Sequence, residues 1–243
     1  MTGARRPDTP FWVERSGVMG DRLRLGPEES HHLLRVHRAG TGAPFQAIDG
    51  EGSLYECVLE SVERRSAIGR IVDRRTSVGE LDYPIRLIVG LPDWGALERL
   101  TALAVPLGAS VLDIVPCART GRAALGAPRL GRLYRLARAG LKQSRRTNLP
   151  EIRSSTSLKQ ALGLVREGAR FAADPDGYPA VNAVGRSGPS AVAIAVGPPG
   201  GFVKEERDRL LGERFSFISL GPSRLSTETA AVAMLSFARN SLY

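Results

Sequence analysis

The hydrophobic pattern of this chain changes its character once, between Val78 and Pro84, and this change constrains the fold most. Before it, short segments of β-forming residues are separated by turns, notably Asp49-Gly50-Glu51-Gly52, whose Asp-Gly step is typical of a hairpin. After it, fully apolar strands alternate with helical stretches, which is typical of a mostly parallel sheet. We therefore expect an α/β protein with two domains, residues 1–80 and residues 81–243.

The first domain is expected to be a small β-barrel that carries a single helix. A proline and two acids in Gly26-Pro27-Glu28-Glu29 suit a first helical turn. Strands are expected at residues 11–13, 22–25, 45–48, 54–62 and 67–74. In the second domain, strands are expected at 85–91, 111–115, 170–173, 191–196 and 217–220, and helices at 97–107, 129–144, 158–167, 203–211 and 228–242.

Charge and composition limit the classes of function. The chain has 34 basic and 25 acidic residues, a net charge of +9, which favours a polyanionic partner. No apolar run could span a bilayer, and residues 1–10 lack the apolar core of a signal peptide, so we expect a cytoplasmic protein without a membrane partner. The two cysteines are far apart and the three histidines do not share a helical face, so neither a disulfide nor a metal site is expected.

The predicted helix near residues 129–146 carries a basic face opposite an apolar one. Its basic residues are Arg132, Arg135, Arg138, Lys142, Arg145 and Arg146. A merely solvated face normally includes acids for pairing along the helix, and this segment contains none. We therefore favour contact with RNA phosphates over a solvated surface.

Two segments near the C-terminus are typical of a ligand site. In the first, a buried strand runs into a loop with Gly197, Gly200 and Gly201, where a ligand can approach the backbone, and acids in the next helical turn argue against phosphate. In the second, a strand and an irregular loop lead into a helix that is apolar on several sides. This pattern indicates that the core buries the helix, and it is compatible with further burial by a second subunit. Glu228 suits the dipole of that helix better than a catalytic role.

These two segments resemble a known family. Val196-Gly-Pro-Pro-Gly-Gly-Phe202 followed by Leu220-Gly-Pro-Ser-Arg-Leu-Ser-Thr-Glu-Thr-Ala230 is similar to the paired signature of the 16S rRNA uridine-N3 methyltransferases, which belong to the SPOUT class. Gln143-Ser144-Arg145-Arg146 with Pro150 resembles the Gln-Ser-x-Arg segment of that family. His32-Leu33-Leu34-Arg35-Val36, and Asp49-Gly50 with Tyr55, resemble its barrel domain. The landmarks cover nearly the whole chain in the order of the family.

The resemblance implies a SPOUT α/β fold whose C-terminal part is tied in a deep trefoil knot, with a PUA-like N-terminal barrel that helps to hold RNA. It also implies a homodimer that uses S-adenosylmethionine and acts on 16S rRNA within the small ribosomal subunit. Cofactor contacts are expected from Asp174, Gly197, Pro198, Gly200, Gly201, Leu220, Gly221, Leu225, Thr229 and Ala230. RNA contacts are expected from Arg35, Arg38, Arg138, Lys142 and Arg145.

The implied reaction sets the requirements for catalysis. Uracil N3 carries a proton and becomes a nucleophile only after losing it, so a base or a positive field is required. Because N3 lies on the pairing edge, the uridine must be unpaired or flipped out. Arg224 and Arg146 are the candidates for the positive field, and Glu228 is the acidic candidate for a catalytic role.

The sequence departs from the family pattern in the expected site. Pro199 stands where the family has an acid, and Ser223 and Ser226 stand where it has arginines. Two alternatives therefore remain open: a catalytically silent RNA-binding relative, and a SPOUT methyltransferase that acts on another RNA position, such as a ribose hydroxyl. The target nucleotide, the general base, and the choice between naked RNA and assembled subunit stay undetermined at this stage.

Overall fold

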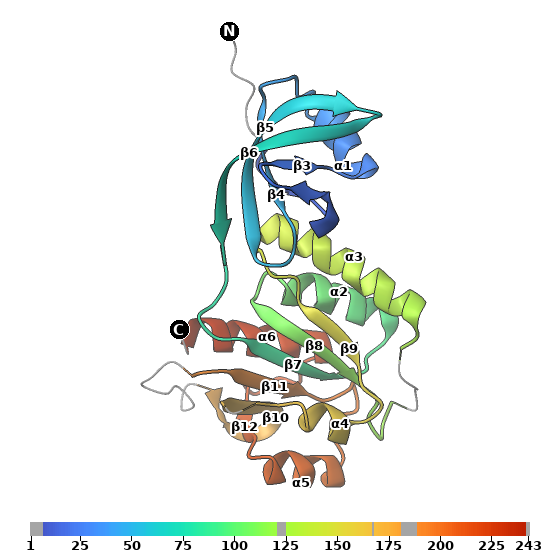
Figure 1. The fold of residues 1–243 in the computed structure, drawn as a ribbon. Coiled ribbons are helices and arrows are strands. Elements are labelled where there is room, and N and C mark those ends of the chain that lie inside the picture. Colours follow the sequence, from blue (N-terminus) through green and yellow to red (C-terminus); the bar gives the residue numbers. More distant parts are fainter. Residues whose placement is uncertain (1–6, 121–124, 167, 181–188, 242–243) are drawn as a thin grey trace. The chain divides into compact units, whose positions relative to one another are not determined.

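The structure is a computed structural model that describes residues 7–120, 125–166, 168–180 and 189–241 (Figure 1). The chain divides into two compact units. The first comprises Met1–Glu80 with Arg138–Leu149, and the second comprises Leu81–Ala137 with Pro150–Tyr243. Each unit contains one six-stranded sheet. Two expected helix ends, Glu167 and Leu242, lie outside the described residues.

The first unit is a curled sheet with the strand order β1-β4-β5-β6-β3-β2. Its elements are β1 Phe11–Trp12, η1 Arg15–Gly17, β2 Val18–Met19, β3 Arg22–Arg24, α1 Pro27–His31, η2 His32–Val36, β4 Pro44–Ile48, β5 Ser53–Glu63 and β6 Ser66–Thr76. Pairing is antiparallel except between β1 and β4. Two register shifts between β5 and β6 bend this long pair. Leu33 of η2 packs into a core with Phe11, Phe45 and Leu59.

The Asp-Gly turn predicted from the sequence is confirmed between β4 and β5. The Asp49 carboxylate accepts hydrogen bonds from the backbone of Ser53 and Glu51, at 3.0 and 2.8 Å, and from the Tyr55 hydroxyl at 2.9 Å. Burial acts to raise the pKa of Asp49, but these hydrogen bonds outweigh it and hold the pKa below its ordinary value. Gly50 has a φ of 76° and lies so close to Trp12 that a Cβ would clash with the indole ring.

The segment Arg138–Leu149 joins the first unit through this same turn. Leu149 N donates to Gly50 O at 2.8 Å, and Gly52 N donates to Thr147 O at 2.9 Å. Beside them, the side chain of Arg146 is only 2% exposed and forms an ion pair with Glu80 at 2.6 Å. The second oxygen of Glu80 accepts hydrogen bonds from two backbone amides of the segment. This buried pair therefore anchors the segment.

The second unit contains a parallel sheet with the strand order β12-β10-β11-β7-β8-β9. Its elements are β7 Ile85–Gly90, α2 Trp94–Ala104, β8 Ala109–Val115, α3 Ala127–Ser144, β9 Glu151–Ser154, α4 Leu158–Leu162, β10 Ala169–Pro179, β11 Val192–Val196, α5 Lys204–Gly212, β12 Ser216–Ser219 and α6 Thr227–Ser241. The division between the units falls within α3, after Ala137. The expected alternation of apolar strands and helices is confirmed.

Helices cover both faces of the parallel sheet (Figure 1). Strand alternation directs Ala193 and Ala195 to one face, where they share a core with Leu158 of α4 and Leu210 of α5. On the other face α6 packs against β7, β11 and α2. A continuous apolar strand such as β11, with all five residues buried, requires this two-sided cover.

Several elements differ from the expectation, and the largest differences lie in the second unit. Strand β9 was not expected, because Glu151–Ser154 is an edge strand in which only Ile152 is buried. Helix α4 ends at Leu162, before Gly163, instead of continuing to residue 167. Strand β10 extends well beyond residue 173, because the chain loops out and then returns to β12.

The buried pair between Arg146 and Glu80 yields a stability prediction. Arg146→Ala leaves a largely buried carboxylate without its cation, so we expect the first unit to lose about 3 kcal/mol of stability. Urea unfolding followed by Trp12 fluorescence in a Trp94→Phe background reports on this unit. Arg24→Ala, which breaks the exposed pair with Glu63, is the matched control and should cost less than about 1 kcal/mol. Equal losses in the two variants would contradict the anchoring role.

Candidate functional site

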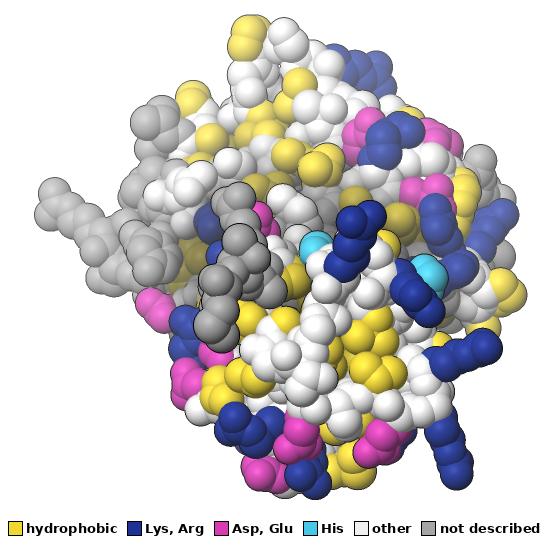
Figure 2. All heavy atoms as spheres, turned by 90° about the horizontal axis from the view of Figure 1, so that it is seen from above, with side chains coloured by type: hydrophobic (Ala, Val, Ile, Leu, Met, Phe, Trp, Pro, Cys, Tyr) yellow, Lys and Arg dark blue, Asp and Glu magenta, His cyan; other side chains and the backbone are white. Residues whose placement is uncertain are grey.

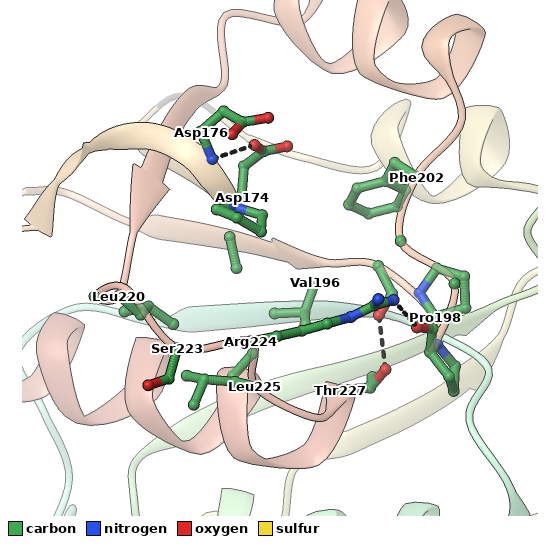
Figure 3. Close-up of a pocket in the computed structure, with 18 of the residues that line it drawn as sticks. Asp174, Asp176, Val196, Pro198, Phe202, Leu220, Ser223, Arg224, Leu225 and Thr227 are labelled. Atoms are coloured by element: carbon green, nitrogen blue, oxygen red, sulfur yellow. Dashed lines mark hydrogen bonds between the residues drawn. The ribbon is translucent and has the colours of Figure 1, made fainter.

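The second unit has a cavity of about 400 Å³ beside the carboxyl ends of three neighbouring strands, β10, β11 and β12 (Figure 3). Ligands of parallel α/β sheets bind at this edge, and the volume lies within the usual range for small-molecule sites. Its lining comprises Ala173, Asp174, Pro175, Asp176, Val196, Gly197, Pro198, Pro199, Gly200, Gly201, Phe202, Arg207, Leu220, Gly221, Pro222, Ser223, Arg224, Leu225, Thr227 and Ala230.

The loop that follows β11 is held from several sides. The Gly197 carbonyl accepts a hydrogen bond from Thr227 Oγ1, and the Pro198 carbonyl accepts one from Gly201 N. The Pro199 carbonyl accepts a hydrogen bond from Arg224 Nη2, and the Gly200 carbonyl accepts one from Arg119 Nη1. These donors come from α6, from the loop itself, from the loop after β12 and from the segment after β8. The loop is thereby organised before any ligand arrives, which reduces the ordering cost of binding.

Glycines allow the two loops to line the cavity with backbone. A Cβ on Gly197 would lie 3.0 Å from Phe202 N, so the loop closes tightly only with glycine there. Gly201 and Gly221 have φ values of 73° and 116°, which favour glycine. Apart from its two chain neighbours, no described residue comes within 4 Å of the position of a Cβ on Gly221, so this wall is open to a ligand.

Opposite the glycine loop, strand β10 supplies an acidic wall. Ala173 and Tyr178 both pair with Ile218 of β12, so residues 174–177 form a four-residue bulge. Asp174 is buried, forms an ion pair with Arg207 and accepts a hydrogen bond from Asp176 N at 2.9 Å. The cavity therefore has an acidic side at β10 and the guanidinium of Arg224 on the opposite side (Figure 3).

All of the expected cofactor residues except Thr229 line this cavity. The Thr229 backbone instead donates to Ser226 Oγ at 3.2 Å at the start of α6. Sequence reasoning missed Asp176, Arg207 and Thr227 as lining residues. The bulge and the first turns of α5 and α6 position them. Thr227 lies within the second family segment, whereas neither spacing nor a motif signals the placement of Asp176 and Arg207. Contact with a cofactor stays a prediction for every residue of the set.

The structure separates the three catalytic candidates. Arg224 lines the cavity, and its guanidinium donates to Pro199 O at 3.1 Å. Glu228 does not line the cavity and instead pairs with Arg99 at 2.9 Å, in keeping with a first-turn acid of α6. Arg146 belongs to the first unit and is buried against Glu80. Within its own unit, therefore, nothing supports the catalytic role expected of Arg146, and a structural role accounts for its contacts.

The first unit carries a basic and aromatic surface on η2. This segment is a single π-helical turn, a rare element that often marks functional sites, and Arg38 follows it with a φ of 53°. The His32 and His37 rings lie 4.9 Å apart, and Phe11 packs edge-on against both. Burial, aided by the neighbouring His32, lowers the pKa of His37, which favours its neutral form near pH 7. In Figure 2, Lys and Arg side chains lie beside the histidines.

The basic residues of η2 differ from those of α3 in their partners. Arg35 and Arg38 are exposed, and their side chains have no hydrogen bond or ion pair with another residue that the structure describes. In contrast, Arg138 pairs with Glu14 at 3.1 Å and Lys142 pairs with Glu29 at 2.6 Å. Arg145 donates to the Asp8 carbonyl.

The acid-free sequence of α3 does not reveal these pairs, because the partner acids lie elsewhere in the chain. Arg132 likewise pairs with Glu98, within the second unit. The contacts with RNA stay predictions, and they have their best structural support at Arg35 and Arg38, whose charges are not neutralised by a described acid.

The cysteines offer no activated nucleophile. Burial raises the pKa of Cys57 and of Cys117 to about 12, with nearby Glu56 and Glu206, respectively, adding to the effect. Among the described residues, no group of three or more His, Cys, Asp and Glu side chains could hold a metal ion. A helix that is long and apolar enough to cross a membrane is also absent from the described part of the chain.

Comparison with known families agrees with this architecture. A family model described as an RNA methyltransferase domain matches residues 79–239, and one described as an RNA methyltransferase PUA domain matches residues 25–72. The chain therefore belongs to the RNA methyltransferase family with a PUA domain, and the resemblance seen in the sequence is confirmed.

The individual relatives share one name. The ribosomal RNA small subunit methyltransferase E of Mycobacterium bovis is 26% identical over 233 residues, which cover 93% of this chain and 88% of the relative. The protein of the same name from Bacillus subtilis is 26% identical over 220 residues, covering 86% of each chain.

Solved structures show the same fold. The small subunit methyltransferase E of Neisseria gonorrhoeae, described as bound to S-adenosyl methionine, has a TM-score of 0.81 at 23% identity and covers 94% of this chain and 95% of its own. A probable rRNA-methyltransferase from Porphyromonas gingivalis has a TM-score of 0.81 at 25% identity, with 96% and 98% covered.

The basic surface on η2 yields a prediction for RNA binding. Arg35→Ala with Arg38→Ala should weaken binding to a 16S rRNA transcript and lower the slope of log affinity against log salt by about two, roughly one per lost phosphate contact. Filter binding at several salt concentrations measures this slope. The double variant Arg22→Ala with Arg24→Ala is the control, because it removes the same amount of positive charge. Since these two arginines already pair with Glu60 and Glu63, this variant should change the slope less. An unchanged slope in the Arg35 and Arg38 variant would rule out this surface.

Proposed function

We propose that this protein transfers a methyl group from S-adenosylmethionine to N3 of one uridine in 16S ribosomal RNA. The observation that carries the proposal is the cavity at the ends of β10, β11 and β12, which is built by the two loops of the RNA methyltransferase domain and crossed by Arg224. The names of the relatives and the cofactor in the Neisseria structure support the same conclusion.

The lining of the cavity suits this cofactor. Val196, Leu220, Leu225 and Ala230 supply an apolar wall for a flat base, and the open side of Gly221 gives access to backbone. Opposite them, the β10 bulge supplies carboxylate acceptors for polar groups. S-adenosylmethionine supplies a methyl group on a sulfonium, which needs a nucleophile held in line and close.

The protein must then create that nucleophile. Arg224 lines the cavity, and its one described hydrogen-bond partner is the Pro199 carbonyl. Its positive charge is therefore not neutralised by any described carboxylate. Its positive field would stabilise the uracil anion that forms when N3 loses its proton to water. By contrast, Asp174 neutralises Arg207. The target uridine has to leave its base stack to reach the cavity, and the PUA domain, with Arg35 and Arg38, would hold the surrounding RNA.

The finer architecture belongs to the same proposal. We infer a trefoil knot in the C-terminal part of the domain from the resemblance of its two loops to those of the SPOUT class; in the structure, a hydrogen bond of 3.0 Å from Thr227 Oγ1 to Gly197 O joins the start of α6 to the loop after β11. The division of labour is an RNA-binding domain of residues 1–80 and a catalytic domain of residues 81–243. A homodimer in the cytoplasm that acts on the small ribosomal subunit completes the proposal.

One observation favours a second candidate, a catalytically silent RNA-binding relative. Ser223 lines the cavity at a position where the resemblance implies an arginine, and Ser226 is engaged in the first turn of α6. The charge that remains on this side is that of Arg224, which is held by a loop carbonyl. The two candidates differ in whether methyl transfer occurs.

Methyl transfer tests the proposal directly. Labelled S-adenosylmethionine is incubated with small ribosomal subunits that lack the modification, and reverse transcription locates the product. The proposed function predicts a new stop at one uridine. RNA binding without transfer would identify the silent relative, and a methyl group on a ribose would identify a different methyltransferase.

Arg224→Ala should lower the rate of methyl transfer by roughly 100-fold or more, since one preorganised donor to a developing anion contributes about that much. Single-turnover kinetics measure the rate, and calorimetry should show an S-adenosylmethionine affinity within about threefold of wild type. Arg166→Ala removes an exposed arginine of the same unit outside the cavity and should leave both quantities unchanged. An Arg224 variant as fast as wild type would exclude the field-stabilising role.

A further inference from the structure

Asp176 has a place in the cavity that no sequence motif indicated. It lies in the bulge of β10, where Gly177 presses against β12 so closely that a Cβ would come within 2.6 Å of Phe217 C and Ile218 N. Only glycine fits at that contact, so the bulge has a fixed geometry. Together with Asp174, Asp176 forms the acidic side of the cavity (Figure 3).

The two aspartates of the bulge differ in their partners. The carboxylate of Asp174 is occupied by Arg207 and by the backbone amide of Asp176. The carboxylate of Asp176 has no hydrogen bond or ion pair with another residue that the structure describes, and the residue is exposed. Asp174 therefore stabilises the bulge, and both oxygens of Asp176 remain available to a ligand.

The position of Asp176 in the sheet indicates which ligand group it meets. Strands β10 and β11 are parallel neighbours, and β11 leads into the glycine loop. In open α/β sheets, an acid at the end of the strand next to a glycine loop is well placed to accept hydrogen bonds from the vicinal hydroxyls of a nucleoside ribose. The apolar wall of Val196, Leu220 and Leu225 lies across the cavity, where a base would pack.

We propose that the Asp176 carboxylate binds the 2′- and 3′-hydroxyls of the cofactor ribose and so fixes the nucleoside in the cavity. Two acceptor oxygens match two donor hydroxyls, and hydrogen bonds to a charged acceptor are stronger than neutral ones. Asp176 is thus a cofactor-positioning residue. The inference rests on the proposed function, because it takes S-adenosylmethionine as the ligand.

Binding of nucleoside fragments tests the inference. 5′-Methylthioadenosine contains the base and the ribose without the sulfonium or the amino acid, so it isolates the ribose contact. Calorimetry with Asp176→Asn should show about tenfold weaker binding of 5′-methylthioadenosine, S-adenosylmethionine and S-adenosylhomocysteine alike. The 2′-deoxy analogue of 5′-methylthioadenosine should bind more weakly than the parent to wild type, and the substitution should cost it less affinity than it costs the parent, since one of the two hydrogen bonds is already absent.

The controls separate the possible outcomes. Asp208→Asn removes an exposed acid of the same unit that pairs with Lys204 outside the cavity, and should leave all affinities unchanged. An unchanged affinity for 5′-methylthioadenosine in Asp176→Asn would overturn the inference. A loss confined to S-adenosylmethionine would also overturn it, because the carboxylate would then act on the sulfonium. If wild type binds none of these ligands, the proposed function itself fails.

Discussion

The parallel pairing of β12, β10 and β11 is the constraint on which the site depends. Parallel strands bring their carboxyl ends to one edge, so three loops from distant parts of the chain meet there. The loop after β11 is then held by donors from α6, from the loop after β12 and from the segment after β8. The cavity exists because these segments satisfy the polar backbone of the loop without filling the space beside it.

Charge is distributed unequally around this cavity. Asp174 and Arg207 form an ion pair with each other. Asp176 and Arg224 have no oppositely charged partner among the described residues, and they lie on opposite sides of the cavity. One side then suits hydroxyl donors and the other suits a developing anion. The sequence departs from the family pattern at Pro199 and Ser223. Both residues lie near Arg224, which donates a hydrogen bond to the Pro199 carbonyl in the loop after β11.

The basic residues of the first unit fall into two groups for a similar reason. Acids from separate elements engage Arg138, Lys142 and Arg146, so their positive charge is compensated within the fold. Arg35 and Arg38 extend from a π-helical turn, and no described acid pairs with them. A net charge of +9 therefore does not show where a polyanion binds, because pairing decides which charges remain available.

The sequence by itself determined the order of the main strands and helices, the change from turn-rich strands to buried parallel ones, and the two loops that bear most of the cofactor candidates. These features depend on local periodicity and on glycine, which are readable along the chain. Only the tertiary structure decided the bulge that exposes Asp176, the pairing of Glu80 with Arg146 and the placement of Glu228 beside Arg99. Each of these features depends on contacts between residues that are far apart in sequence. Such contacts form only when strands pair and helices pack, so a local sequence pattern does not predict them.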